Sequence, residues 1–133
     1  MKPIALLLIF VSTIFATQYS VIISKKTDID SLTAQQIRDI FLQKRHSLGN
    51  QKIIPLNLVG QEPSRIAFES DVLGMGRDRL NTYWVKQHFQ GITPPITQPS
   101  HESIKAFVQN VEGSIGYIPS SMVDTSVKVI YEF

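Results

Sequence analysis

The sequence predicts an α/β domain, and three observations support that prediction. The chain has 133 residues, of which 43% are hydrophobic and 18% are charged, as is usual for a globular domain with one modest core. Apolar residues alternate or run together in some segments, as in strands, and recur at helical spacing in others. These segments follow one another without an internal repeat or a low-complexity linker, so a second domain is not indicated.

The first 16 residues have the composition of a secretory signal. A charged start at Lys2 precedes an apolar run over residues 4–11, and the small residue Ala16 suits a cleavage site. The run is shorter than the ~20 residues that span a bilayer, so an uncleaved anchor is the weaker alternative. We therefore predict a signal peptide over residues 1–16 and a domain over residues 17–133. The expected location is periplasmic or otherwise secreted, with no membrane span after cleavage.

Charge and cysteine content narrow the possible partners. Lys and Arg number 13 and Asp and Glu number 11, which gives a net charge of only +2. The densest basic cluster, Lys44-Arg45-His46, is too short to mark a nucleic-acid surface, so we expect no nucleic-acid partner. The chain has no cysteine, and His46, His88 and His101 lack the spacing of metal ligands. We therefore expect no metal and no cofactor.

Four segments have the character of strands. Residues 19–24 and 114–118 are short apolar runs, and residues 127–133 nearly alternate between apolar and polar side chains. Residues 52–58 are also apolar but contain Pro55. Because proline has no N–H to donate to a ladder, this segment is predicted to be an edge strand or to carry a bulge.

Four further segments have the character of helices: residues 33–41, 63–73, 78–90 and 100–112. The first has the clearest start, since Thr33 can cap it and Gln36 can complete a capping box. Ser100 can cap the last helix. Gly74 and Gly91 follow the two middle helices and are expected to end them.

The candidate functional site is the turn between the second strand and the second helix. Residues 57–68 read NLVGQEPSRIAF, so a glycine turn leads from an apolar segment to a helix start. Backbone N–H groups at a helix start, together with the helix dipole, favour an anion. We therefore predict that Gly60, Gln61, Ser64 and Arg65 bind a small oxyanion such as phosphate or sulfate, with Arg65 as a charge-assisted donor.

Two features of this turn favour other interpretations. Glu62 places a carboxylate where an anion would lie, and Pro63 removes one backbone donor. Arg65 could pair with Glu62 or Glu69 instead of a ligand, in which case the site is already filled. A carboxylate-bearing or peptide ligand is a third alternative.

The residues predict no catalytic site. Neither Gly-x-Ser-x-Gly nor Ser-x-x-Lys occurs after residue 16. Glu69 and Asp71 lie two apart on a predicted helix, so their carboxylates point in different directions. Tyr83 and Trp84 fit core packing better than stacking on a ligand. The sequence therefore predicts a protein that is not an enzyme.

A set of short motifs runs through nearly all of the chain after the signal. In chain order they are LTAQQIRDIF at 32–41, the strand at 53–58, Arg65-x-x-Phe68, Val72-Leu73, Tyr83-Trp84, Phe89-x-Gly91 and Gly113-Ser114-Ile115-Gly116-Tyr117. This ordered set resembles the phosphate-type periplasmic substrate-binding proteins of ABC transporters.

The resemblance implies one lobe of a periplasmic-binding-protein-like fold, with a mixed sheet flanked by helices. Members of that family have two lobes that close on a ligand, whereas this chain matches a single-lobe, half-length branch. The resemblance therefore implies an exported, non-enzymatic binding protein with weak affinity for an oxyanion such as phosphate, because half a clamp desolvates its ligand from one side only.

The turn departs from the family pattern. Two-lobed members carry Ser-Gly-Thr at the helix start and an Arg just upstream of it. Here Glu62 and Pro63 replace the Ser and the Gly, Ser64 matches the Thr, and the upstream Arg is missing. The alternative function is a cell-envelope interaction or sensor-accessory module that kept the fold and lost ligand binding. Such a module would bind a membrane transporter, a sensor protein or a second copy of itself, as a homodimer.

Overall fold

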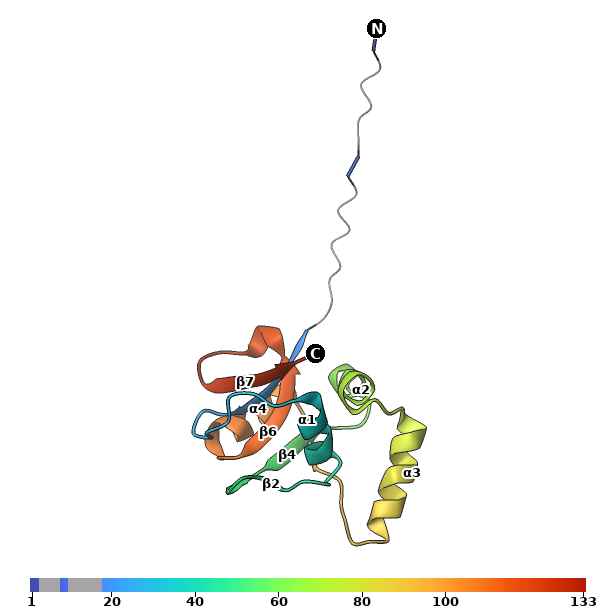
Figure 1. Cartoon of the computed structure of the whole chain (residues 1–133), viewed down its shortest axis with the longest axis vertical. Coiled ribbons are helices and arrows are strands. Elements are labelled where there is room, and N and C mark those ends of the chain that lie inside the picture. Colours follow the sequence, from blue (N-terminus) through green and yellow to red (C-terminus); the bar gives the residue numbers. More distant parts are fainter. Residues whose placement is uncertain (3–7, 10–17) are drawn as a thin grey trace.

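The computed structural model describes residues 1–2, 8–9 and 18–133 (Figure 1). The predicted signal peptide over residues 1–16 therefore lies mostly outside the described residues. In the part of the chain that is described, none of the helices combines the length and the apolar character that a membrane crossing requires.

A five-stranded mixed sheet lies at the centre of the fold, with strand order β5-β4-β6-β1-β7. Its strands are β1 (Tyr19–Ser24), β4 (Ile54–Leu58), β5 (Ile96–Gln98), β6 (Ser114–Pro119) and β7 (Val127–Glu132). β4 runs parallel to β5 and β6, whereas β1 runs antiparallel to β6 and β7. The strands β2 (Ser47–Leu48) and β3 (Gln51–Lys52) form a separate small hairpin. The predicted mixed α/β architecture is confirmed.

The four predicted helices are present. They are α1 (Ala34–Phe41), α2 (Pro63–Phe68) with the π-helical turn η1 (Glu69–Leu73), α3 (Arg77–His88) and α4 (His101–Asn110), and a 3-10 turn η2 (Ser120–Met122) precedes β7. Thr33 caps α1 in a complete capping box with Gln36. Ser100 caps α4 by accepting a 3.1 Å hydrogen bond from the N–H of Ser103. Gly74 ends η1 in the left-handed conformation.

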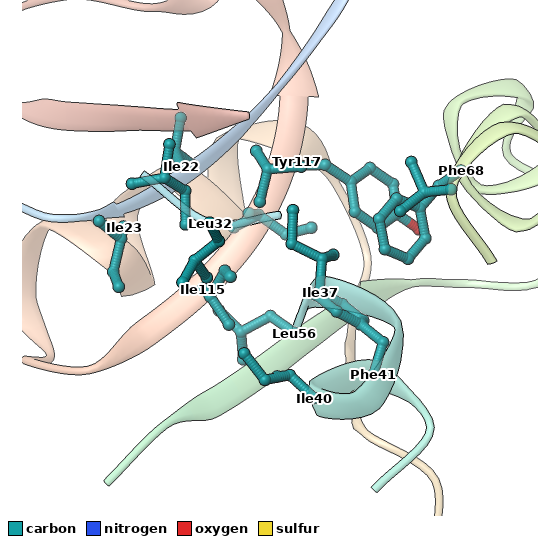
Figure 2. Packing of buried hydrophobic residues seen from close by; sticks show 14 of the residues in the cluster. Ile22, Ile23, Leu32, Ile37, Ile40, Phe41, Leu56, Phe68, Ile115 and Tyr117 are labelled. Carbon is teal, nitrogen blue, oxygen red and sulfur yellow. The ribbon is translucent and has the colours of Figure 1, made fainter. Parts of the chain in front are cut away.

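The two faces of the sheet are covered by different helices. On one face Ile37, Ile40 and Phe41 of α1 pack against the side chains of β6 that point toward them, Ile115 and Tyr117 (Figure 2). Side chains alternate along a strand, so Gly116 faces the other way from its neighbour Ile115. A Cβ at Gly116 would collide with Ile104, which places α4 on the second face.

Pro55 does not mark an edge strand, and the prediction of an edge or a bulge at β4 is wrong. β4 lies between β5 and β6, but β5 pairs with it only from Leu56 onward. The N–H of Ile54 donates to Gly113 O at 2.9 Å, on the side of β6. The backbone of Pro55 therefore faces the other side, at a level where β5 has not begun, so proline costs no ladder bond.

Candidate functional site

The predicted turn lies where two helix starts meet. α2 follows β4 and α4 follows β5, and because these strands are parallel neighbours both helices begin at the same edge of the sheet. Ser64 Oγ of α2 and His101 Nε2 of α4 are 2.7 Å apart, within hydrogen-bond distance. The site thus combines residues from two connections at the carboxyl ends of neighbouring strands.

The four predicted ligand residues lie together but in different environments. Gly60 and Gln61 are exposed in the turn, whereas Ser64 is buried and Arg65 is half-buried. The backbone N–H groups of Gly60, Gln61 and Ser64 donate to no other residue in the described part of the chain. Of these N–H groups, that of Ser64 belongs to the first turn of α2, and those of Gly60 and Gln61 lie in the turn just before the helix.

Arg65 points back toward the end of β4. Its Nη1 donates to Leu58 O at 2.7 Å, and its Nε lies 3.4 Å from Glu69 Oε1. Of the two acidic partners that the sequence allowed, Glu69 is therefore the one that Arg65 meets. The guanidinium group ties α2 to the strand that precedes it.

Glu69 is a buried carboxylate held between two arginines. It is 4% exposed, and Arg77 Nε lies 3.2 Å from its Oε1, the same oxygen that Arg65 approaches. The Arg77 guanidinium also donates to Gly60 O. Because a buried charge is tolerated only when it is paired, this cluster fixes α2, the Gly60 turn and the start of α3 relative to one another.

The buried side chain of Tyr117 holds the end of β4 in place. Burial raises the pKa of its hydroxyl far above the ordinary value, so the hydroxyl stays protonated and donates to Asn57 Oδ1. The same oxygen accepts a 3.0 Å hydrogen bond from the N–H of Leu58. The strand end that carries the turn is therefore held by buried hydrogen bonds.

Glu62 does not occupy the donors of the helix start. It is the N-cap residue of α2, but its side chain accepts no capping hydrogen bond, and its Oε1 lies 3.8 Å from His101 Nε2. A protonated His101 would form an ion pair with this carboxylate. Glu62 thus contributes a negative charge beside the site without filling it.

The contact between Ser64 and His101 can run in two directions. When Nε2 carries no proton, the Ser64 hydroxyl donates its hydrogen bond to Nε2 and cannot donate to a ligand. When Nε2 carries a proton, the hydroxyl oxygen accepts from it, and the hydroxyl can donate to a ligand. Glu62 approaches this same Nε2, whereas the acid of a catalytic triad holds Nδ1. The arrangement therefore fits hydrogen bonding to an anion better than nucleophilic catalysis.

Sequence reasoning did not include His101 in the site, and it placed no metal there. The histidine lies 37 residues from Ser64, and only the pairing of β4 with the short strand β5 brings the two together. Among the described residues, no group of three or more His, Asp or Glu side chains is placed to hold a metal ion.

No protein-family model and no curated protein sequence matches the chain. Solved structures do match it. A putative phosphate ABC transporter substrate-binding protein from Clostridium perfringens, solved with bound phosphate, has a TM-score of 0.70 at 24% identity, covering 86% of this chain and 45% of that one.

Two further structures have the same relation to the chain. An ABC-type phosphate transport receptor from Vibrio cholerae has a TM-score of 0.68 at 18% identity, and the match covers 86% of this chain and 46% of the receptor chain. PstS from Borrelia burgdorferi has a TM-score of 0.65 at 13% identity, and the match covers 86% of this chain and 47% of the Borrelia burgdorferi chain. This chain thus spans less than half the length of these proteins. At such identities the likeness shows the fold, which matches one lobe of a periplasmic binding protein, as the order of motifs predicts.

Proposed function

We propose that the chain is an exported, non-enzymatic binding protein that holds a small oxyanion such as phosphate where α2 and α4 begin. The observation that carries the proposal is the meeting of these two helix starts, with Ser64 and His101 in contact and, beside them, backbone N–H groups that donate to no other described residue. Two converging helix dipoles favour negative charge more than one does. The phosphate-binding structure from Clostridium perfringens supports the same ligand class.

Each residue of the turn has a role in this proposal. The N–H groups of Gly60 and Gln61 and the hydroxyl of Ser64 donate to the oxyanion. Arg65 orients the turn through Leu58 O and adds positive charge. Binding is expected to be weak, because Glu62 lies nearby and the described residues enclose the anion from one side.

A thermal-unfolding series with phosphate, sulfate, molybdate and simple carboxylates tests the proposal. A ligand at about 100 times its dissociation constant should add ~2.7 kcal/mol to the free energy of unfolding. We expect at least one tetrahedral oxyanion to stabilise the protein at millimolar concentration. If none of these anions does, the binding proposal is wrong.

Glu62→Gln is expected to tighten phosphate binding. Removing one negative charge close to the bound anion should gain about 1 kcal/mol, roughly fivefold in dissociation constant. Isothermal titration calorimetry on both proteins measures the change. Glu112→Gln, at an exposed position beyond the far end of α4, makes the same charge change and should have no effect. Equal effects of the two substitutions would place the anion elsewhere.

Export has its own test. We expect protein recovered from the cell envelope to begin at Thr17, as N-terminal sequencing would show. Recovery of the protein with Met1 or Lys2 still attached would contradict cleavage after Ala16.

A protein-interaction role is the second candidate, favoured by apolar side chains that flank the turn. Val59 and Ile66 are each 46% exposed, on either side of the candidate site. A transporter component, a sensor protein or a second copy of the chain would cover them. A photo-reactive residue at position 66 should cross-link such a partner in the envelope, whereas one at position 112 should not. Failure to cross-link at position 66 would count against this role.

A further inference from the structure

A cavity that is separate from the strand-end turn lies between α1 and α3. Its volume is about 410 Å³, which falls in the range of small-molecule pockets. Figure 1 shows α3 to one side of the sheet, with α1 between them. None of the residues proposed above to bind the oxyanion lines this cavity.

The cavity is built from matching faces of the two helices. α1 and its C-cap supply Gln35, Arg38, Asp39 and Leu42, and α3 supplies Arg79, Thr82 and Tyr83. Both sets follow the spacing of three and four residues that places side chains on one helix face. The segment between the helices completes the lining with Leu73, Gly74 and Met75.

The charges of the lining are mainly positive. The lining includes three cationic side chains, those of Arg38, Lys44 and Arg79, and one carboxylate, that of Asp39. Arg38 is held in place, because Nη2 donates to Gln35 Oε1 at 2.9 Å and Nη1 lies 3.4 Å from Val72 O. The amide of Gln35 donates in turn to Asp39 Oδ1 at 2.9 Å, which engages the carboxylate. The cavity thus offers a positioned guanidinium group to an anion.

The rest of the lining is apolar. Leu42 and Leu73 are buried, and Met75 and Tyr83 are half-buried. The Tyr83 hydroxyl donates to Leu42 O at 2.6 Å, which fixes its ring as a wall of the cavity. Burial, and after it the charge of Asp39, raises the pKa of Tyr83, so this donor stays protonated.

We propose that this cavity binds a small organic anion in which a carboxylate or sulfonate is attached to an apolar body. Arg38 and Arg79 take the charged end, and Leu42, Met75 and the ring of Tyr83 contact the apolar part. The site and its ligand class are independent of the oxyanion site, so either can exist without the other.

Three probes test the proposal on the purified protein by amide NMR titration. They are 3-phenylpropionate, its uncharged amide, and acetate. We expect 3-phenylpropionate to cause saturable shifts at the backbone amides of Arg38 and Thr82. The other two probes should bind at least about tenfold more weakly, because the amide lacks the negative charge and acetate lacks the apolar body. The absence of saturable shifts at these amides, or equal binding of the uncharged amide, would overturn the proposal.

A charge-reversing substitution gives an independent test. Arg79→Glu should weaken 3-phenylpropionate by about tenfold or more, and Lys26→Glu, at an exposed position outside the cavity, should leave it unchanged. Equal losses would mean that only net charge matters, which would overturn the proposal.

Arg79 is exposed, so the Arg79→Glu variant should keep the fold, and the same spectra report whether it does. If it does not survive, the three probes on the unaltered chain still decide the outcome. Inorganic phosphate should leave the amides of Arg38 and Thr82 unshifted.

Discussion

Phe68→Ala is expected to lower the free energy of unfolding by about 3–5 kcal/mol. The Phe68 side chain is fully buried, and its ring stacks on Tyr117 with 4.3 Å between centroids. The ring also meets Phe41 of α1 edge-on at 4.6 Å (Figure 2). Removing it loses these two contacts and a third, edge-on contact with Phe133, and it leaves a cavity between α1, α2 and β6 that their backbones cannot close fully.

Urea unfolding followed by circular dichroism measures the loss. Phe89→Ala is the matched control, because Phe89 is 85% exposed and its truncation should change the free energy of unfolding by less than about 0.5 kcal/mol. Similar effects of the two substitutions would contradict this account of the core. Phe68 also anchors the end of α2, so the substitution should weaken anion binding at the start of that helix.

Gly113→Ala is expected to lower the free energy of unfolding by about 2–4 kcal/mol, from left-handed backbone strain and overpacking together. Gly113 has φ +79°, and a Cβ there would overlap the carbonyl oxygen of Lys52. A backbone shift cannot relieve this cheaply. The N–H of Gly113 donates to Thr27 Oγ1 at 2.9 Å, and its carbonyl accepts from Ile54 at the same distance.

Gly60→Ala is the control for this prediction. Gly60 lies in a turn with φ outside the left-handed region, and a Cβ there would meet no atom within 4 Å. Its substitution should change the free energy of unfolding by less than about 0.5 kcal/mol, measured by the same urea titration. If Gly113→Ala were as mild as Gly60→Ala, the close approach of β3 to the start of β6 would be wrong.

Much of the fold could be predicted because its signals are local. The capping box at Thr33 and Gln36 needs only neighbouring residues, and the buried strand β1 needs only its own apolar run. The role of Pro55 depends instead on where β5 begins in the sheet. β5 itself has only three residues, Ile96–Gln98, and only the first of them is apolar. It therefore lacks the apolar run by which a strand is recognised in a sequence.

The candidate site divides in the same way. The turn that contains Gly60 and Ser64 could be located because a glycine and a helix start are adjacent in sequence. His101 could not be assigned to the site, because its contact with Ser64 depends on the pairing of β4 with β5. The choice of Glu69 over Glu62 as the partner of Arg65 also needed geometry. Glu69 lies one turn along the same helix, whereas Glu62 precedes α2 and lies beside His101.

The proposed function requires that a small oxyanion binds where α2 and α4 begin. Amide NMR spectra recorded during a phosphate titration test it most directly, because they report both affinity and position. If the oxyanion binds there, the amides of Gln61, Ser64 and His101 should show saturable shifts. Shifts that do not saturate there, or that saturate only at residues elsewhere in the chain, would contradict it.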